Sequence, residues 1–261
     1  MDDMRLPPEL AVLFLDGGAD RALATPLPEG MSTRGLQLWV SASLTTGQQW
    51  AAFRAEHHRS GLWPLLLLDD GWEPGQDAPW SLGEVGLHDA GAFMAAMWAE
   101  WVAEDDDDPD YDLEDLEPFG RECPGLAPKG DSAADPGRVA DWYAGELDDR
   151  RSYLGLVAAR RGAEALCAMG WNGAINYHET PALVSMLLSW EERFGARVVA
   201  AGPDTLHLSV SAPPETLDHA LHVAAEHFVV CMDNIQQRTT PTLKDYAADL
   251  VGSNSWAFWW D

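Results

Sequence analysis

Several patterns that commonly carry chemistry are missing from this sequence. Its three cysteines, Cys123, Cys167 and Cys231, lie far apart and form no CxxC pair, so neither a zinc ribbon nor a thioredoxin-like redox motif is predicted. There is no GxSxG elbow, no SxxK, no P-loop and no GxGxxG. The hydrolases and nucleotide-binding proteins that these motifs define are therefore not predicted. No motif therefore assigns a reaction, and no cofactor is predicted.

Long apolar runs and positive charge near the start are also lacking. The run at residues 10–15, "LAVLFL", is too short for a membrane span or the core of a signal peptide. The segment "MDDMRLPPEL" is acidic where a signal peptide needs positive charge. We therefore expect a cytoplasmic protein with reduced thiols and no membrane partner.

Basic residues are few compared with acidic ones. Lys and Arg number 16 against 43 Asp and Glu, so the formal net charge is −27. Phosphate backbones and anionic lipids would repel such a chain, which excludes nucleic acid as an expected partner. A basic protein or a cation is the natural complement. A role of the acidity in solubility alone stays open.

The first hundred residues alternate strand-like and helix-like segments. Strands are expected at 10–15, 36–43 and 62–70, the last as a continuous apolar run typical of a strand buried on both faces. Helices are expected at 45–61 and 88–104. In the second helix, apolar residues recur at helical spacing and predict core packing; they are Met94, Met97, Trp98 and Trp101.

An acidic tract followed by a Pro- and Gly-rich stretch divides the chain. Residues 104–117 contain no basic residue, and residues 118–137 are rich in Pro and Gly. We predict an N-terminal α/β part at 1–103, a linker or surface loop at 104–136, and a C-terminal α+β domain at 137–261.

The C-terminal part is again dense in predicted elements. A strand is expected at 152–159, a hairpin at 196–210, and helices at the ranges 162–170, 179–196, 212–228 and 240–250. The final "WAFWWD" reads as a strand with Trp256, Phe258 and Trp260 on one face. Because its other face is also largely apolar, we expect this strand to be buried within the sheet and to close the core.

The C-terminal part resembles a known but uncharacterised bacterial family. The motifs in order are "RSYLGLVAARRGAEALCAMGWNGAINY", "SWEERFGARVVAAGPDTLHLSVSAPP", "AAEHFVVCMDNIQQ" and the terminal "WAFWWD". Over about residues 150–261 they resemble the family catalogued as domain of unknown function 4253. Met232 stands where proline is expected, and Arg238 where glycine is expected. The resemblance implies an α+β domain and no agreed activity.

One helix carries the nearest approach to a metal site. In "DHALHVAAEHFVVCMD" the side chains of His219, His222 and Glu226 fall on one side of the helix, opposite its apolar residues. Two histidines and a carboxylate can ligate zinc and leave a position for water, as in a metal-dependent hydrolase. The alternative is an ordinary solvated helix face, and the HExxH motif is absent.

The acidic tract is the main candidate binding surface. Six of its carboxylates follow an EF-hand-like count, namely Asp106, Asp108, Asp110, Asp112, Glu114 and Glu117. Tyr111 takes the place of the glycine that a true EF-hand needs, so only loose cation binding is open. The same carboxylates could mimic a phosphate backbone.

Glu191 and Arg193 are a further pair of candidate binding residues. Two positions apart on a helix, they point in different directions and do not pair with each other. Our first expectation is that Arg193 clamps Asp261 or the terminal carboxylate. The second is a substrate carboxylate or phosphate.

The sequence thus predicts an α+β fold with a mixed or mostly antiparallel sheet and helices packed on its faces. The favoured function is that of a non-enzymatic acidic binding protein, of the immunity or inhibitor type, that captures a basic protein. The alternative is the metal-dependent hydrolase.

Overall fold

The described strands form one mixed sheet. The computed structural model describes residues 5–33, 37–69, 79–104, 116–131 and 134–261. Within these ranges the sheet has seven strands in the order β1-β2-β4-β3-β5-β6-β7. Their bounds are β1 Gly30–Ser32, β2 Leu38–Leu44, β3 Leu62–Leu68, β4 Ser152–Ala158, β5 Arg197–Ala201, β6 Thr205–Ser209 and β7 Ser255–Trp259.

The strand pairing confirms the predicted fold class. β3 and β5 pair in parallel, and the other named neighbours pair antiparallel. All seven residues of β3 are buried, as its unbroken apolar run predicts. β4, which follows the acidic tract in sequence, lies between β2 and β3, which precede it. Strands from both sides of the predicted linker therefore share one sheet, while the division into domains stays a prediction.

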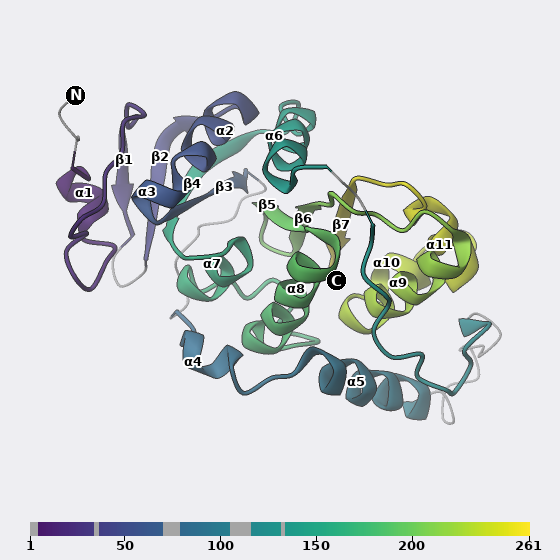
Figure 1. The fold of residues 1–261 in the computed structure, drawn as a ribbon. Helices are drawn as coiled ribbons and strands as arrows, with labels where there is room; N and C mark the ends of the chain where they lie inside the picture. Colours follow the sequence, from purple (N-terminus) through teal and green to yellow (C-terminus); the bar gives the residue numbers. More distant parts are fainter. Residues whose placement is uncertain (1–4, 34–36, 70–78, 105–115, 132–133) are drawn as a thin grey trace.

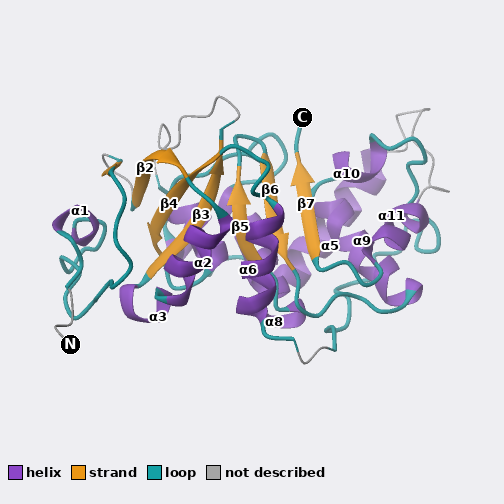
Figure 2. Cartoon of the chain, turned by 90° about the horizontal axis from the view of Figure 1, so that it is seen from above, coloured by secondary structure: helices purple, strands orange, loops and turns teal. Residues whose placement is uncertain are grey.

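Helices cover both faces of the sheet (Figures 1 and 2). On one face lie α2 and α6, with α3 following α2, and on the other lie α7, α8 and α9, with α5 and α11 packed outside them. The bounds are α1 Pro8–Ala11, α2 Gly47–Ala55, α3 His57–Ser60, α4 Leu82–Val85, α5 Ala90–Glu104, α6 Pro136–Glu146, α7 Gly162–Ala168, α8 Thr180–Phe194, α9 Leu217–Val230, α10 Asp233–Gln236 and α11 Leu243–Leu250.

The strand predicted at residues 10–15 is wrong. The residues form the end of α1 and the turns after it. Pro8 suits the first turn of a helix, and the glycines at 17 and 18 adopt positive φ. Leu10 and Leu13 are buried, whereas Val12 and Leu15 are exposed. The apolar run is therefore only partly used by the core.

The predicted core stripe in α5 is confirmed. Met94 and Trp98 are buried, and Met97 and Trp101 pack at the edge of the same hydrophobic core. The Trp98 ring meets the Phe228 ring of α9 edge-on, with 5.7 Å between centroids. The stripe thus attaches α5 to the helical layer.

The C-terminal strand closes the core, as predicted, but it lies at the edge of the sheet. Trp256, Phe258 and Trp260 are buried against α8 and α9, where the Trp190 ring stacks on Phe258 with centroids 5.5 Å apart. Trp259, on the other face, is 39% exposed. The expectation of a strand buried on both faces is therefore wrong, because the face with Ala257 and Trp259 is exposed, and in the described chain β7 has a paired strand on one edge only.

The side chain of Asn234, on α10, lies along the open edge of β7. The Asn234 amide donates to the carbonyl of Ala257 at 2.7 Å and accepts from the amide of Trp259 at 3.3 Å. Nδ2 also lies 3.2 Å from the hydroxyl of Tyr246. Asn234 thus supplies the hydrogen bonds that a neighbouring strand would supply, which limits edge-to-edge association.

Replacing Asn234 with alanine should free this edge. We expect a loss of about 1–2 kcal/mol in the free energy of unfolding, because two strand groups and a tyrosine hydroxyl lose a partner. Urea unfolding followed by tryptophan fluorescence measures the loss. Gln236→Ala, on the same short helix, is the matched control and should change stability by less than about 0.5 kcal/mol. Equal stability of the two variants would refute the role of Asn234.

Candidate functional site

Most of the predicted acidic binding residues lie outside the described residues. These are Asp106, Asp108, Asp110, Asp112 and Glu114. Glu117, the last carboxylate of the tract, is exposed. Loose cation binding and phosphate mimicry by this tract stay predictions.

Arg193 forms a buried ion pair, with a partner different from the expected one. Its Nη1 and Nη2 donate to the two carboxylate oxygens of Glu226 at 2.7 and 2.8 Å. Glu226 is fully buried, and the Arg193 side chain is 16% exposed. The indole N–H of Trp190 donates to the same carboxylate. The expectation that Arg193 clamps Asp261 is wrong; the bidentate partner comes from α9.

The same ion pair binds a backbone segment that follows the acidic tract. The amide of Ala127 donates to Glu226, and its carbonyl accepts from Arg193 Nη1 at 2.9 Å. His219 Nε2 lies 2.8 Å from the carbonyl of Pro128, and the amide of Gly130 donates to the carbonyl of Arg193 at 3.0 Å. We call residues 127–130 the strap. Arg193, Glu226 and His219 together hold it against α8 and α9.

The structure does not bring the predicted metal ligands together. Glu226 points into the core, not to the exposed side of α9, and both its oxygens are occupied by donors. His219 is used by the strap, and His222 packs on the Phe119 ring with centroids 5.0 Å apart. Over the described ranges, no three His, Cys, Asp or Glu side chains are grouped to hold a metal. The predicted exposed His/His/Glu face is therefore wrong.

Glu191 has a structural partner in the start of α7. Its carboxylate accepts from Arg161 Nε at 2.7 Å and from the amide of Ala163 at 3.1 Å, and it is 6% exposed. The amide belongs to the first turn of α7, where a carboxylate is favourable. Glu191 therefore joins α8 to α7, and its binding role stays a prediction.

The buried cysteines and histidines are packed in the core. Burial raises the pKa of the Cys167 and Cys231 thiols to about 12, so both stay protonated and poorly nucleophilic. Burial lowers the pKa of His227 to about 3 and that of His178 and His207 to about 4. These imidazoles are neutral at physiological pH.

An exposed tryptophan on α6 is the candidate binding residue that the sequence analysis missed. α6 is capped by Asp135, whose carboxylate accepts from the amide of Arg138 at 2.8 Å. Ala140, Tyr143 and Ala144 bury one side of the helix against the sheet. Trp142 lies off this buried stripe and is 48% exposed, the largest exposed fraction of any described tryptophan. From the sequence alone, this residue could have been found as a large aromatic side chain that falls outside the apolar stripe of a helix.

Two carboxylates and one arginine share the side of α6 that carries this tryptophan. Along α6, positions 135, 138, 142 and 146 follow one another at helical spacing, so their side chains share one side of the helix. A hollow of about 480 Å³ is lined by Ala134, Asp135, Arg138, Val139, Trp142 and Asn254. Glu146, the last residue of α6, and Asp149, three residues later, are also exposed. We call this surface, from Asp135 to Asp149 with Asn254, the Trp142 face.

The comparisons with known proteins identify the class of the C-terminal part. Residues 153–261 match the family described as Domain of unknown function (DUF4253). No curated protein and no solved structure matches the chain. In the described ranges, helices long and apolar enough to cross a membrane are absent.

Proposed function

We propose that this protein is a non-enzymatic binding protein, of the immunity or inhibitor type, that captures a basic protein partner through the Trp142 face. The observation that supports this most is the half-exposed Trp142 beside a hollow, with carboxylates before and after it. Binding energy in protein interfaces concentrates in such aromatic anchors. We place this activity in the cytoplasm.

Charge supplies the second part of the proposal. A net charge of −27 gives a field that attracts a basic partner from a distance and speeds its encounter. The carboxylates of Asp135, Glu146 and Asp149 are exposed on the Trp142 face. They would attract a basic partner toward Trp142. The tract at 104–117 would extend the acidic surface and mimic a phosphate backbone, which suits a nuclease-like partner.

Two variants separate the anchor from the charge. With the partner isolated by low-salt pull-down, Trp142→Ala is expected to weaken its dissociation constant by about 10- to 100-fold through faster dissociation. Glu146→Gln with Asp149→Asn should slow association several-fold at low salt and little at high salt. Stopped-flow mixing or surface plasmon resonance with the purified partner measures both rates.

A charge-matched control guards against unspecific attraction. Glu29→Gln with Glu100→Gln removes two exposed carboxylates, one before β1 at the far edge of the sheet and one on α5, outside the Trp142 face. This variant should bind like the unchanged protein. If it slows association as much as the α6 pair does, or if Trp142→Ala binds normally, the Trp142 face is not the binding surface. Neutralising the acidic tract then tests whether the partner binds there.

A further inference from the structure

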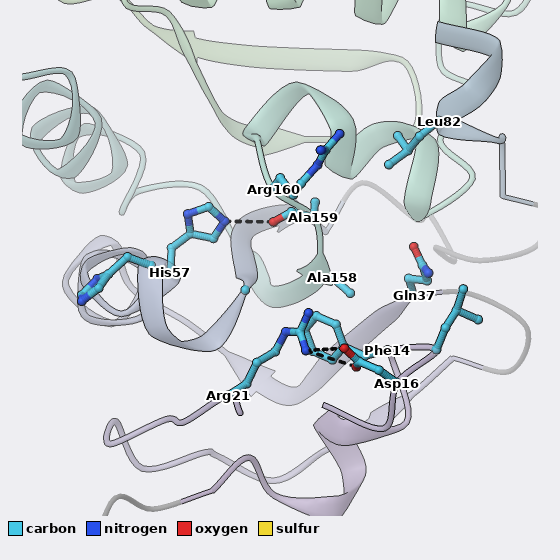
Figure 3. A pocket seen from close by; sticks show the side chains of 12 residues that line it. Phe14, Asp16, Arg21, Gln37, His57, Leu82, Ala158, Ala159 and Arg160 are labelled. Carbon is cyan, nitrogen blue, oxygen red and sulfur yellow. Dashed lines mark hydrogen bonds and ion pairs between the residues drawn. The ribbon is translucent and has the colours of Figure 1, made fainter. Parts of the chain in front are cut away.

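A second hollow lies beside α1, α3 and α4, among elements that the proposed function does not use. It has a volume of about 550 Å³, within the range typical of ligand sites. Its walls come from the segment after α1, the residue before β2, α3 with the glycine that follows it, α4, and the end of β4 with the residues after it (Figure 3). Five distant parts of the chain thus meet there.

One wall is held rigidly by an arginine. Arg21 Nη1 donates to both oxygens of Asp16, at 2.9 and 3.1 Å, and its guanidinium lies 4.1 Å from the centre of the Phe14 ring. Gly61, with φ of +70°, lies beneath: an added Cβ would come within 3.0 Å of Arg21 Nε and 3.3 Å of Phe14. The close approach is possible because residue 61 is glycine.

The opposite wall carries an arginine with donors to spare. His57 Nε2 lies 2.9 Å from the carbonyl of Ala159 and so fixes the backbone before Arg160. Arg160 makes one side-chain ion pair in the described chain, to Glu164 at 3.2 Å, and its side chain is 83% exposed. A guanidinium has five N–H donors, so most of those on Arg160 remain for another acceptor.

A glutamine lies across the hollow from His57 (Figure 3). The backbone of Gln37 is fixed on both sides, since its amide donates to Ala168 and its carbonyl accepts from Ala158. Its side-chain amide has no hydrogen-bond partner among the described residues. It is a free donor and acceptor within a preformed wall.

The hollow continues into an apolar neighbour. A second hollow of about 780 Å³ shares Phe14, Leu15, Gln37 and Leu82 with the first. Val12 and Leu15 line it and are 70% and 102% exposed, an unusual state for large apolar side chains. The two hollows together present an end with free guanidinium and amide donors and an apolar end.

Charge distinguishes this place from the rest of the chain. The first hollow is lined by two arginines and two histidines against one carboxylate, in a protein of net charge −27. Asp16 is neutralised by Arg21, which also holds the pKa of that carboxyl below its usual value. Arg160 also pairs with Glu164, but only through Nη2 in the described chain, so its remaining N–H donors are free for a ligand. Its planar fork fits a carboxylate, and a single negative charge is repelled less than a dianionic phosphate would be.

We propose that these joined hollows bind a small amphiphilic carboxylate, with its head on Arg160 and Gln37 and its apolar chain along Phe14, Leu15 and Leu82. The site is separate from the Trp142 face, and neither depends on the other.

Isothermal titration calorimetry with decanoate tests this inference on the full chain. We expect about one decanoate per chain, and at least tenfold weaker binding of decanol, which has the chain without the charge. Arg160→Gln should weaken decanoate binding about tenfold and leave decanol unchanged. Arg151→Gln is the matched control: it is an exposed arginine in a 3.1 Å ion pair with Asp69, before the start of β4.

A second variant tests the apolar arm without disturbing the core. Leu15→Gln alters a fully exposed side chain and should weaken both decanoate and decanol several-fold. The proposal is overturned if decanoate fails to bind, if it binds in many copies per chain, or if decanol binds equally well. It is also overturned if Arg160→Gln and Arg151→Gln bind decanoate alike, or if Leu15→Gln has no effect.

Discussion

Replacing Glu226 with alanine is expected to destabilise the protein by about 3–5 kcal/mol, because the change leaves a buried charge without its partner. Arg193 would lose both carboxylate oxygens while its side chain stays 16% exposed. The indole N–H of Trp190 and the amide of Ala127 would lose the same acceptor. Chemical denaturation followed by tryptophan fluorescence measures the loss in the free energy of unfolding.

An exposed glutamate on the neighbouring helix is the matched control. Glu192 is 70% exposed and pairs with Arg161 at 3.1 Å. Glu192→Ala should cost less than about 1 kcal/mol, since solvent-exposed ion pairs contribute little. Because Glu226 also holds the strap, its alanine variant should increase proteolysis near residues 127–130. A Glu226→Ala protein as stable as Glu192→Ala would show that the buried pair is not needed.

Acidification is expected to destabilise the protein before its ordinary carboxylates titrate. The pKa of His227 is about 3, and those of His178 and His207 are about 4, because burial disfavours the charged imidazole. In the unfolded chain these histidines titrate near 6.5. Between pH 6.5 and about 4 the unfolded state therefore binds more protons than the folded state, and stability falls as the pH falls. For three such groups the loss between pH 6.5 and 5 is about 3–5 kcal/mol.

Single histidine variants separate this effect from the general charge of the protein. His207 lies 3.0 Å from the hydroxyl of Tyr143, which a glutamine oxygen can also accept. His207→Gln should therefore reduce the pH dependence by about a third, while His58→Gln, at an exposed position, should leave it unchanged. The measurement is the free energy of unfolding at pH 7.5, 6.5 and 5. A flat dependence would mean that the buried histidines are protonated in the folded state.

The Trp142 face and the hollow beside Arg160 suit two kinds of ligand. The Trp142 face combines an exposed aromatic ring with carboxylates, as a basic protein requires. The hollow beside Arg160 has spare cationic donors and an apolar extension. The polar residues of the family-like stretch, by contrast, are engaged in holding the fold: Glu191 joins α7 to α8, and Arg193 with Glu226 holds the strap.

Local sequence patterns were enough to predict most elements of the fold. The apolar run of β3, the helical stripe of α5 and the alternation in the terminal strand each follow from side-chain periodicity, which depends only on neighbouring residues. The same patterns support the α+β class. The error at residues 10–15 has a local cause, because an apolar run of six residues fits a helix end as well as a strand.

The sequence by itself determined the acidity, the fold class, and the closing of the core by the terminal tryptophans. Tertiary structure alone decided which polar residues are free. Glu226 falls beside two histidines on a helical projection, yet α8 and the strap approach it from distant parts of the chain and bury it. The hollow beside Arg160 likewise exists because five separate segments meet. Burial and convergence depend on packing between remote residues, and local periodicity contains no information about such packing.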